Sequence, residues 1–384
     1  MRYCVVGAGF SGAVVARALV EAGHKVLVVD ERAHVAGNCH SQRDPATGIM
    51  THVYGPHIFH TANERVWAYL QQFGEWMPYQ HRVRAVANGA VYSLPINLLT
   101  INQFFGKTMG PEEARTFVAG RSQGVEEPAN FEEQALRMIG PELYQAFFEG
   151  YTRKQWGLAP TELPASVLKR LPVRFDYEDS YFAHPHQAMP RNGYTEVVAS
   201  ILAVPNIELR LATPFEDLAE SFAHVVYTGP IDRYFDFRCG RLGYRTLDFE
   251  VFRVKGDYQG TAVLNYCDID TPFTRITEHK HFAPWEKAEF DESICYREFS
   301  RPCGPDDTPY YPIRLSTEET MLNEYVDLTR SAEGVSFLGR LGSYRYLDMD
   351  VTIGEALDAA DVMLGHIRQG TAIPSFFKAP VTKH

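Results

Sequence analysis

Y-C-V-V-G-A-G-F-S-G, residues 3–12 of the 384-residue chain, is the run from which its fold can be argued. The first four of these residues are apolar and indicate a short buried strand, and a G-x-G-x-x-G run follows at once. Residues 13–22 then predict a helix that Gly23 ends, because glycine readily adopts the left-handed conformation that follows a helix. Residues 25–29 predict a second apolar strand, and Asp30 stands at its end.

This order of strand, glycine turn, helix and strand predicts a βαβ unit that binds a dinucleotide. Gly7, Gly9 and Gly12 let the backbone turn tightly and approach a pyrophosphate, which then faces the free N–H groups of the helix. Asp30 lies eighteen positions after Gly12, where a carboxylate can hold a ribose hydroxyl. The alternative is a tight turn without a ligand, but the agreement of all parts of the unit favours a bound dinucleotide.

The residues after this acid favour FAD over NAD by resemblance. Glu31 and Arg32 continue the chain past Asp30, and Gly37-Asn38 forms a second turn. Flavoproteins of the amine-oxidase and glutathione-reductase kind carry a similar extension. The resemblance therefore implies a flavin dinucleotide in this unit.

Composition limits the class of protein. A chain of 384 residues suits two or three domains, and 45% apolar with 22% charged residues is ordinary for a soluble globular protein. The net charge of −11 argues against nucleic-acid binding, which needs basic patches. It leaves room for an anionic ligand, because local arginines decide the potential inside a pocket.

The cysteines and the apolar runs indicate a reducing compartment. None of the six cysteines forms C-x-x-C, and no Cys/His cluster has zinc spacing, so we expect no metal. The chain starts in a predicted strand without a cleavage site, and it lacks an uninterrupted apolar run of about 18 residues. We therefore expect a cytoplasmic protein without a membrane segment.

The pattern along the chain predicts an α/β fold, in which an FAD-binding Rossmann-like (βαβ) domain is interrupted by a helical insertion and an antiparallel β-sheet domain. Helical periodicity dominates residues 112–151, and short β-like runs dominate residues 247–299. Further strands that return to the nucleotide sheet are expected at residues 207–211, 224–227 and 335–338, with a final helix at 351–368.

The expected domains are discontinuous. The FAD-binding domain comprises residues 1–78, 190–235 and 325–368. The helical domain comprises residues 96–165, and the sheet domain comprises residues 79–95, 175–189 and 236–324. Residues 369–384 show no periodicity, so we expect a disordered tail. The helical insertion offers a surface for a homodimer.

Three local clusters allow two interpretations each. His57 and His60 follow a turn at Gly55-Pro56, and they either stabilise that loop by hydrogen bonds or face the flavin. The aromatic residues at 147–156 either pack helices or stack on a base or sugar. The three cations of residues 169–174 are either solvated surface charges or a clamp for phosphates.

Taken together, eight motifs resemble one family, bacterial UDP-galactopyranose mutase, over residues 3–367. They are G-A-G-F-S-G (7–12), Y-G-P-H-I-F-H-T (54–61), G-Y-T-R-K-Q-W-G (150–157), K-R-L-P-V-R-F (169–175), Y-T-G-P-I-D (227–232), F-T-R-I-T-E-H-K-H (273–281), P-Y-Y-P (309–312) and G-R-L-G-S-Y-R-Y (339–346).

The resemblance implies an isomerase that interconverts UDP-galactopyranose and UDP-galactofuranose and so supplies galactofuranose for cell-surface glycans. It implies FAD that is active when reduced, with NAD(P)H or another reductant to activate it. The family reaction passes through an adduct between N5 of the reduced flavin and the sugar. The protein then has to position the substrate, stabilise the departing diphosphate and exclude water.

The resemblance also implies roles for individual residues. Those matched to catalytic positions are Arg170, Arg275, His57 and His60. Those matched to substrate-binding positions are Phe147, Tyr151, Trp156, Asp179, Tyr181, Tyr311, Tyr346 and Asp348. Those matched to cofactor-binding positions are Gly7, Gly9, Phe10, Ser11, Gly12, Asp30, Glu31, Arg32, Gly37, Asn38, His57, Arg340 and Met349. Residues 156–174 correspond to a mobile substrate loop, and Asp179 departs from an asparagine of some members, which could alter contacts to the base.

Alternative functions stay open at this point. Related enzymes act on UDP-N-acetylgalactosamine or on dTDP-sugars with the same fold, and a histidine kept in the 54–61 loop favours galactose only moderately. An FAD-dependent oxidoreductase would not need paired phosphate-binding arginines. A carrier or regulatory protein would keep the βαβ unit without a flavin.

Overall fold

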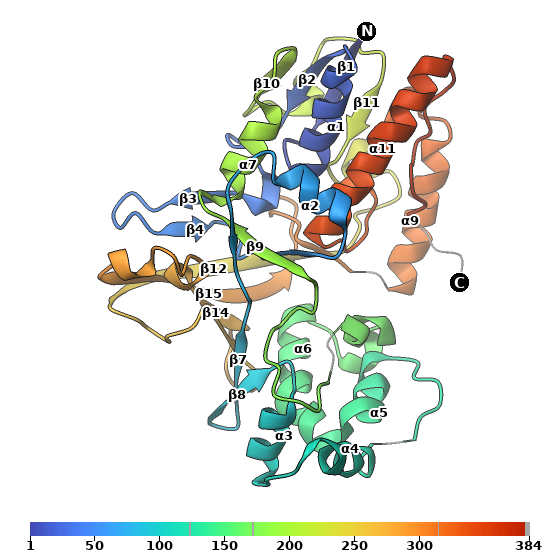
Figure 1. Cartoon of the computed structure of the whole chain (residues 1–384). Coiled ribbons are helices and arrows are strands. Elements are labelled where there is room, and N and C mark those ends of the chain that lie inside the picture. Colours follow the sequence, from blue (N-terminus) through green and yellow to red (C-terminus); the bar gives the residue numbers. More distant parts are fainter. Residues whose placement is uncertain (123, 171–172, 314, 381–384) are drawn as a thin grey trace.

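The computed structural model describes residues 1–122, 124–170, 173–313 and 315–380. Figure 1 shows a parallel sheet with its helices at one end of the molecule, a helical domain at the other end, and a long twisted sheet between them. The chain has the expected α/β architecture. Within the described ranges, we find no helix that combines the length and the apolarity needed to cross a membrane.

The nucleotide sheet has five parallel strands in the order β10-β2-β1-β11-β17. Its strands are β1 (Arg2–Val6), β2 (Lys25–Val29), β10 (Ile207–Arg210), β11 (Val225–Tyr227) and β17 (Val335–Phe337). The predicted return of three late strands to the first βαβ unit is therefore confirmed. Three helices, α1 (Phe10–Glu21), α7 (Gly193–Leu202) and α11 (Met349–Gln369), pack together beside the sheet, with α1 between the other two (Figure 1).

The second sheet has seven strands in the order β16-β12-β15-β14-β13-β7-β8. They are β7 (Val83–Ala87), β8 (Ala90–Leu94), β12 (Tyr244–Lys255), β13 (Val263–Tyr266), β14 (Arg275–Glu278), β15 (Glu292–Pro302) and β16 (Tyr311–Pro312). Asn88 and Gly89 form the hairpin turn between β7 and β8, and both have the positive φ angles, 51° and 74°, that an Asn-Gly turn adopts. The prediction of a wholly antiparallel sheet is wrong at one place, since β13 pairs with β7 in parallel.

Two small sheets join the parts. One has the order β5-β9-β6, from β5 (Phe59–Thr61), β6 (Trp76–Pro78) and β9 (His186–Pro190), and the other pairs β3 (Ser41–Arg43) with β4 (Met50–His52). Sequence analysis placed most of β9 in the antiparallel sheet domain and read the 54–61 region as a loop. A strand of three residues, such as β5, is too short for periodicity to reveal, and β9 joins this sheet by pairing with distant strands, which a local pattern does not show.

The helical domain contains α3 (Leu98–Phe105), α4 (Pro111–Ala119), α5 (Phe131–Tyr144) and α6 (Gly150–Trp156), with a π-helical turn over Gln145–Glu149 before α6. Gly140-Pro141 forms a kink inside α5, where Gly140 has a φ of 75°. Asn130 caps α5 by accepting a hydrogen bond from the N–H of Glu133 at 3.0 Å.

The remaining α-helices of the described ranges are α2 (Glu64–Leu70), α8 (Ile231–Tyr234), α9 (Ser316–Thr329) and α10 (Gly339–Gly342). The expectation of a disordered tail is wrong for residues 371–380. The N–H of Phe337 donates to the carbonyl of Ser375 at 2.8 Å, and the rings of Phe337 and Phe376 lie 5.6 Å apart. The tail is ordered here because β17 is an edge strand with backbone groups to satisfy. Residues 381–384 lie outside the described ranges.

Candidate active site

A cavity of about 780 Å³ lies at the carboxyl ends of β1, β2 and β11. Ligands of open α/β sheets bind at this edge. Most residues predicted to bind the cofactor line this cavity: Gly7, Gly9, Phe10, Ser11, Asp30, Glu31, Arg32, Gly37, Asn38, His57, Arg340 and Met349. Sequence analysis missed other lining residues, such as Tyr54 and Thr228, which come from segments distant from the glycine turn.

The glycine turn is shaped by close packing. Gly7 has a φ of +103°, and a Cβ atom there would collide with the hydroxyl of Thr228. A Cβ atom on Gly12 would collide with the carbonyl oxygen of Gly7. Gly12 is not a lining residue of the cavity, so its role is to let α1 pack against the turn. Among the described residues, no side chain caps the N-terminus of α1, which leaves its N–H groups for an anion.

The carboxylate of Asp30 accepts hydrogen bonds from backbone N–H groups of this turn and of the segment after β2. The N–H of Ala8 donates to Oδ2 at 2.8 Å, and the N–H of Arg32 donates to Oδ1 at 2.9 Å. A carboxylate oxygen can accept a second hydrogen bond, so Asp30 keeps capacity for a ribose hydroxyl while it holds the turn. Glu31, beside it, forms an ion pair with Arg233 at 2.6 Å.

An unsatisfied donor in the cavity fits a polar cofactor. Nη1 of Arg32 is buried and has no hydrogen-bond partner among the described residues, although its guanidinium lies 4.7 Å from the ring centroid of Tyr54. Buried donors without a partner are costly, and a phosphate or hydroxyl of a bound dinucleotide would satisfy this one. The free helix end, the glycine turn and this donor together fit FAD.

Arg340 connects the cofactor cavity to a group of tyrosines. It donates to the carbonyl oxygens of Tyr310 at 3.2 Å and Leu347 at 2.6 Å. Its guanidinium lies 4.9 Å from the ring centroid of Tyr346 and 6.0 Å from that of Tyr311. The predicted substrate tyrosines therefore begin where the cofactor cavity ends.

Arg275 is the centre of the predicted substrate site. Its Nε donates to Oε1 of Glu298 at 2.9 Å, and Glu298 is only 1% exposed. Burial raises the pKa of the tyrosines around Arg275. The charge of Arg275 lowers the pKa of these tyrosines, but burial is the larger effect. These tyrosines are Tyr151, Tyr181 and Tyr311. All three phenols are therefore neutral donors close to one guanidinium, as the predicted roles require.

Aromatic rings form one wall of this site. The rings of Tyr311 and Tyr346 stack with centroids 5.7 Å apart, and Trp156 lies 6.5 Å from Tyr311. Phe147 departs from its predicted place, because it is 3% exposed and packs against Tyr92 in the helical core at 5.1 Å. It offers almost no surface to a base. The packing interpretation of the aromatic cluster thus holds for Phe147, and the stacking interpretation stays open for Trp156.

His57 is a neutral base at the edge of the cofactor cavity. Burial and the charges of Arg340 and Arg275 lower its pKa to about 4. Its Nδ1 lies 3.0 Å from the carbonyl oxygen of Gly55, which can only accept, so we assign the proton to Nδ1. Nε2 is then an acceptor. The first interpretation of this histidine holds, since His57 contacts its own loop, and the second, that it faces the flavin, stays a prediction for a residue that lines the cavity.

His60 belongs to a second group of rings. It stacks on Phe182 at 3.6 Å, and its Nδ1 lies 2.8 Å from Nδ1 of His184. Burial and the neighbouring His184 lower the pKa of His60. Asp348 and Asp350 raise it, but the pKa is lowered overall. His60 and Asp348, which the sequence analysis assigned to separate roles, are therefore close in space. Sequence analysis missed Phe182 and His184, which β9 and the segment before it bring to this loop.

One predicted substrate residue, Asp179, is held by two arginines. Asp179 accepts from Arg82 at 2.8 Å and from Arg84 at 3.0 Å. Burial raises its pKa, but these hydrogen bonds outweigh that effect and lower the pKa overall. Its carboxylate is thus held by two arginines that sequence analysis missed, although they alternate as expected for one face of a strand. The side chain of Arg170 and residues 171–172 of the predicted mobile loop lie outside the described part of the chain.

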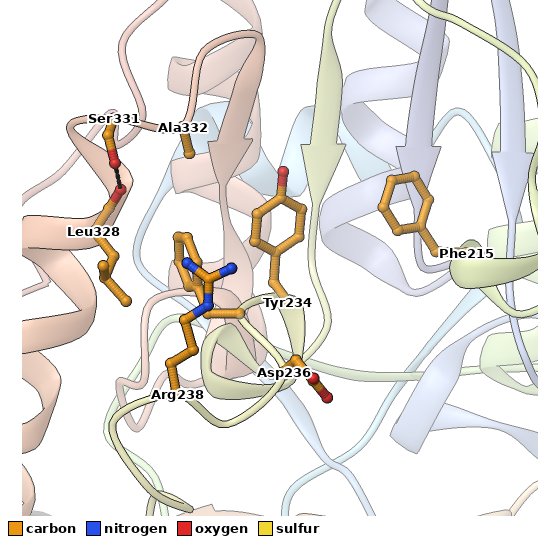
Figure 2. A pocket seen from close by; sticks show the side chains of 8 residues that line it. Phe215, Tyr234, Asp236, Arg238, Leu328, Ser331 and Ala332 are labelled. Atoms are coloured by element: carbon orange, nitrogen blue, oxygen red, sulfur yellow. Dashed lines mark hydrogen bonds between the residues drawn. The ribbon is translucent and has the colours of Figure 1, made fainter.

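Two other features carry none of the predicted site residues. The first is a hollow of about 460 Å³ beside the cofactor cavity, which shares Phe215 with it. Figure 2 shows Tyr234 and Arg238 in this hollow and the hydrogen bond from Ser331 to the carbonyl of Leu328.

The second is a group with the composition of metal ligands, Asp257, Glu278 and His281. Glu278 already accepts from three backbone N–H groups and from Ser293, and Asp257 pairs with Lys280 at 2.6 Å. The protein itself satisfies these carboxylates.

Comparisons with known proteins agree with this geometry. The sequence matches the family described as UDP-galactopyranose mutase over residues 146–346 and the NAD(P)-binding Rossmann-like domain over residues 5–73. It is 56% identical to a probable UDP-galactopyranose mutase of Klebsiella pneumoniae over 374 residues, 97% of each chain. It is 49% identical to a dTDP-fucopyranose mutase of Escherichia coli over 369 residues, 94% of this chain and 97% of that one. A crystal structure of a reduced UDP-galactopyranose mutase shares the fold, with a TM-score of 0.75 at 16% identity over 95% of each chain.

Proposed function

Since the chain belongs to the UDP-galactopyranose mutase family, we propose that it interconverts UDP-galactopyranose and UDP-galactofuranose with reduced FAD in the 780 Å³ cavity. The observation that carries the proposal is the position of Arg275. This guanidinium lies among neutral tyrosines, and Arg340 joins those tyrosines to the cofactor cavity. A nucleotide diphosphate bound there would hold its sugar next to the cofactor.

Reduced FAD, when bound, supplies a nucleophilic nitrogen for the anomeric carbon of the sugar. We propose that NAD(P)H or another reductant brings the flavin to that state. Arg275 then stabilises the negative charge that grows on the departing diphosphate. We place Tyr311 and Tyr346, whose rings stack on each other, as hydrogen-bond donors to the same oxygens.

The base and the sugar engage separate groups. We place the uracil ring against Tyr151 and Trp156 of α6, since an aromatic face stacks on any base. Nε2 of His57 can accept a hydrogen bond from a sugar hydroxyl, because its low pKa keeps it unprotonated at neutral pH. We place His60 and Asp348 beside the sugar as well, and Arg170 on the loop that closes over the diphosphate.

The test is turnover of UDP-galactofuranose by the dithionite-reduced protein, followed by chromatography. We expect UDP-galactopyranose to form, and we expect conversion to stop when the flavin is reoxidised. Equal rates with oxidised protein would contradict the role of the reduced flavin. Release of an oxidised sugar with flavin reduction would instead support an oxidoreductase.

A second candidate substrate is a dTDP-sugar, because a relative that is 49% identical over nearly the whole chain is named dTDP-fucopyranose mutase. Thymine differs from uracil by one methyl group, and fucose differs from galactose by one hydroxyl group. One methyl group changes specificity by roughly 10- to 200-fold, whereas a hydroxyl group that the site hydrogen-bonds changes it by about 10⁴-fold or more. The same assay should therefore compare kcat/KM for UDP-galactofuranose, UDP-N-acetylgalactosamine and dTDP-fucofuranose.

A further inference from the structure

Lys154 occupies a cage of backbone carbonyl groups. Its Nζ donates to the carbonyl oxygens of Tyr266 at 2.7 Å, Asp268 at 2.8 Å, Thr271 at 2.9 Å and Phe273 at 3.1 Å. All four carbonyls belong to β13 or to the connection between β13 and β14. An ammonium group has three donors, so four acceptors around it fix both the lysine and the loop.

The helix that carries Lys154 is pressed against the same loop. Gly150 lies one turn before Lys154 on the same face of α6, and a Cβ atom there would collide with the carbonyl oxygen of Cys267 and meet the backbone N of Ile269 at 3.0 Å. Helix and loop therefore approach each other as closely as their backbones allow. The close approach places the ammonium group within reach of the carbonyls.

The other end of α6 is also attached to the seven-stranded sheet. The carbonyl oxygen of Gln155 accepts from Nε of Arg245 at 3.1 Å and from the hydroxyl of Ser300 at 2.6 Å. A Cβ atom on Gly157, which ends the helix with a φ of +67°, would lie 2.5 Å from Nη1 of Arg245. These contacts satisfy carbonyl groups at the helix C-terminus.

The fixed helix and the fixed loop each lead to one part of the proposed substrate site. Tyr151 and Trp156 lie on α6, and Arg275 begins β14 two residues after the last caged carbonyl, that of Phe273. We propose that Lys154 is a positioning residue: it holds the aromatic platform for the base at a constant separation from the arginine for the diphosphate. This inference rests on the proposed function, because it assumes that the ligand is a nucleoside diphosphate.

A positioning role of Lys154 predicts a change in ligand affinities that a purely stabilising role does not predict. A ligand that spans two fixed subsites gains affinity from both at once, whereas each of its separate halves contacts only one subsite. Loss of the fixed separation should therefore weaken UDP binding while uridine and pyrophosphate bind as before. A defect in folding would instead weaken all three ligands or none.

The experiment compares Lys154→Met with Arg153→Met. Arg153 is the neighbouring cation on α6, is 45% exposed at its side chain and contacts only Glu149 among the ion pairs of the described residues, so it controls for loss of charge on this helix. Affinities of the oxidised holoenzyme for UDP, uridine and pyrophosphate are measured by competition against a fluorescent UDP analogue. We expect Lys154→Met to raise the Kd for UDP about tenfold and to change the Kd values for uridine and pyrophosphate less than twofold. Arg153→Met should bind all three ligands with the affinities of the wild type.

The outcomes separate the two proposals. An unchanged UDP affinity in folded Lys154→Met, or equal weakening of all three ligands, would overturn the positioning role. If Lys154→Met does not fold, Lys154→Gln, which keeps two N–H donors, is measured by the same criteria. Wild-type protein that binds UDP with the expected contrast but converts no nucleotide sugar would reject the proposed reaction and leave the positioning role standing.

Discussion

Replacing Arg275 with methionine should damage stability and ligand binding by two separable routes. The change removes the guanidinium but leaves Glu298 in place, and that carboxylate is 1% exposed. Its side chain keeps one hydrogen bond within the described residues, from the hydroxyl of Thr274 at 3.0 Å. The variant therefore has a buried negative charge without its counterion.

The magnitudes of the two effects can be estimated. Removing one partner of a buried ion pair costs about 3–5 kcal/mol, because the other charge stays desolvated. Arg275→Met should lower the free energy of unfolding by this amount. A charge-assisted hydrogen bond contributes about 1.5–3 kcal/mol, so the affinity for UDP should fall by roughly 10- to 100-fold.

The double variant Arg275→Met/Glu298→Gln distinguishes the routes. It removes the uncompensated charge, so most of the lost stability should return, but the diphosphate still lacks its arginine. Urea unfolding gives the free energy, and titration with UDP gives the affinity, for both single variants and the double one. The reasoning is refuted if Arg275→Met unfolds like the wild type, or if the double variant recovers UDP binding along with stability.

Three further predictions concern other parts of the chain. Burial is the main cause that lowers the pKa of His52, His57, His81 and His224 to about 3 or 4. Their folded pKa lies below the unfolded value near 6.5, so stability is complete above pH 7 and is lost as the pH falls toward 4, by about 2 kcal/mol per histidine between pH 7 and pH 5. In urea unfolding at both pH values, His224→Gln, remote from the site, should remove about 2 kcal/mol of that loss. Gly12→Ala, which meets the carbonyl of Gly7, should purify with far less flavin absorbance than the control Gly365→Ala, where nothing lies within 4 Å. Ending the chain after Gly370 should lower the free energy of unfolding by about 1–3 kcal/mol, because the loss of Phe376 exposes the ring of Phe337.

Local pattern was sufficient to predict the nucleotide-binding unit. The first strand, the glycine turn, the helix and the second strand all lie within residues 2–29, and each has a sequence signature of its own. The same holds for the turn at Asn88-Gly89, whose type follows from two residues. Such features depend on neighbours in the chain, so a single sequence contains what is needed.

The partners of the site residues could not be predicted, because they depend on strand register. Arg275 and Glu298 are direct cross-strand neighbours in the β14–β15 pair, yet they are 23 positions apart in the sequence. A shift of one residue would place Glu298 on the other face of the sheet. Likewise, the sequence near Asp179 does not indicate that Arg82 and Arg84 bind its carboxylate.

The arrangement of the site separates its chemistry from its selectivity. The cofactor cavity is built mainly by the nucleotide sheet and its loops, whereas the proposed base platform is on α6, in the helical insertion. Arg275 and Glu298 come from the seven-stranded sheet, to which α6 is attached by Lys154 and Arg245. A change in the insertion can therefore move the base platform without altering the glycine turn. Under the proposed function, this separation offers a physical reason why one fold can serve nucleotide sugars with different bases, because the sugar would meet one part of the protein and the base would meet another.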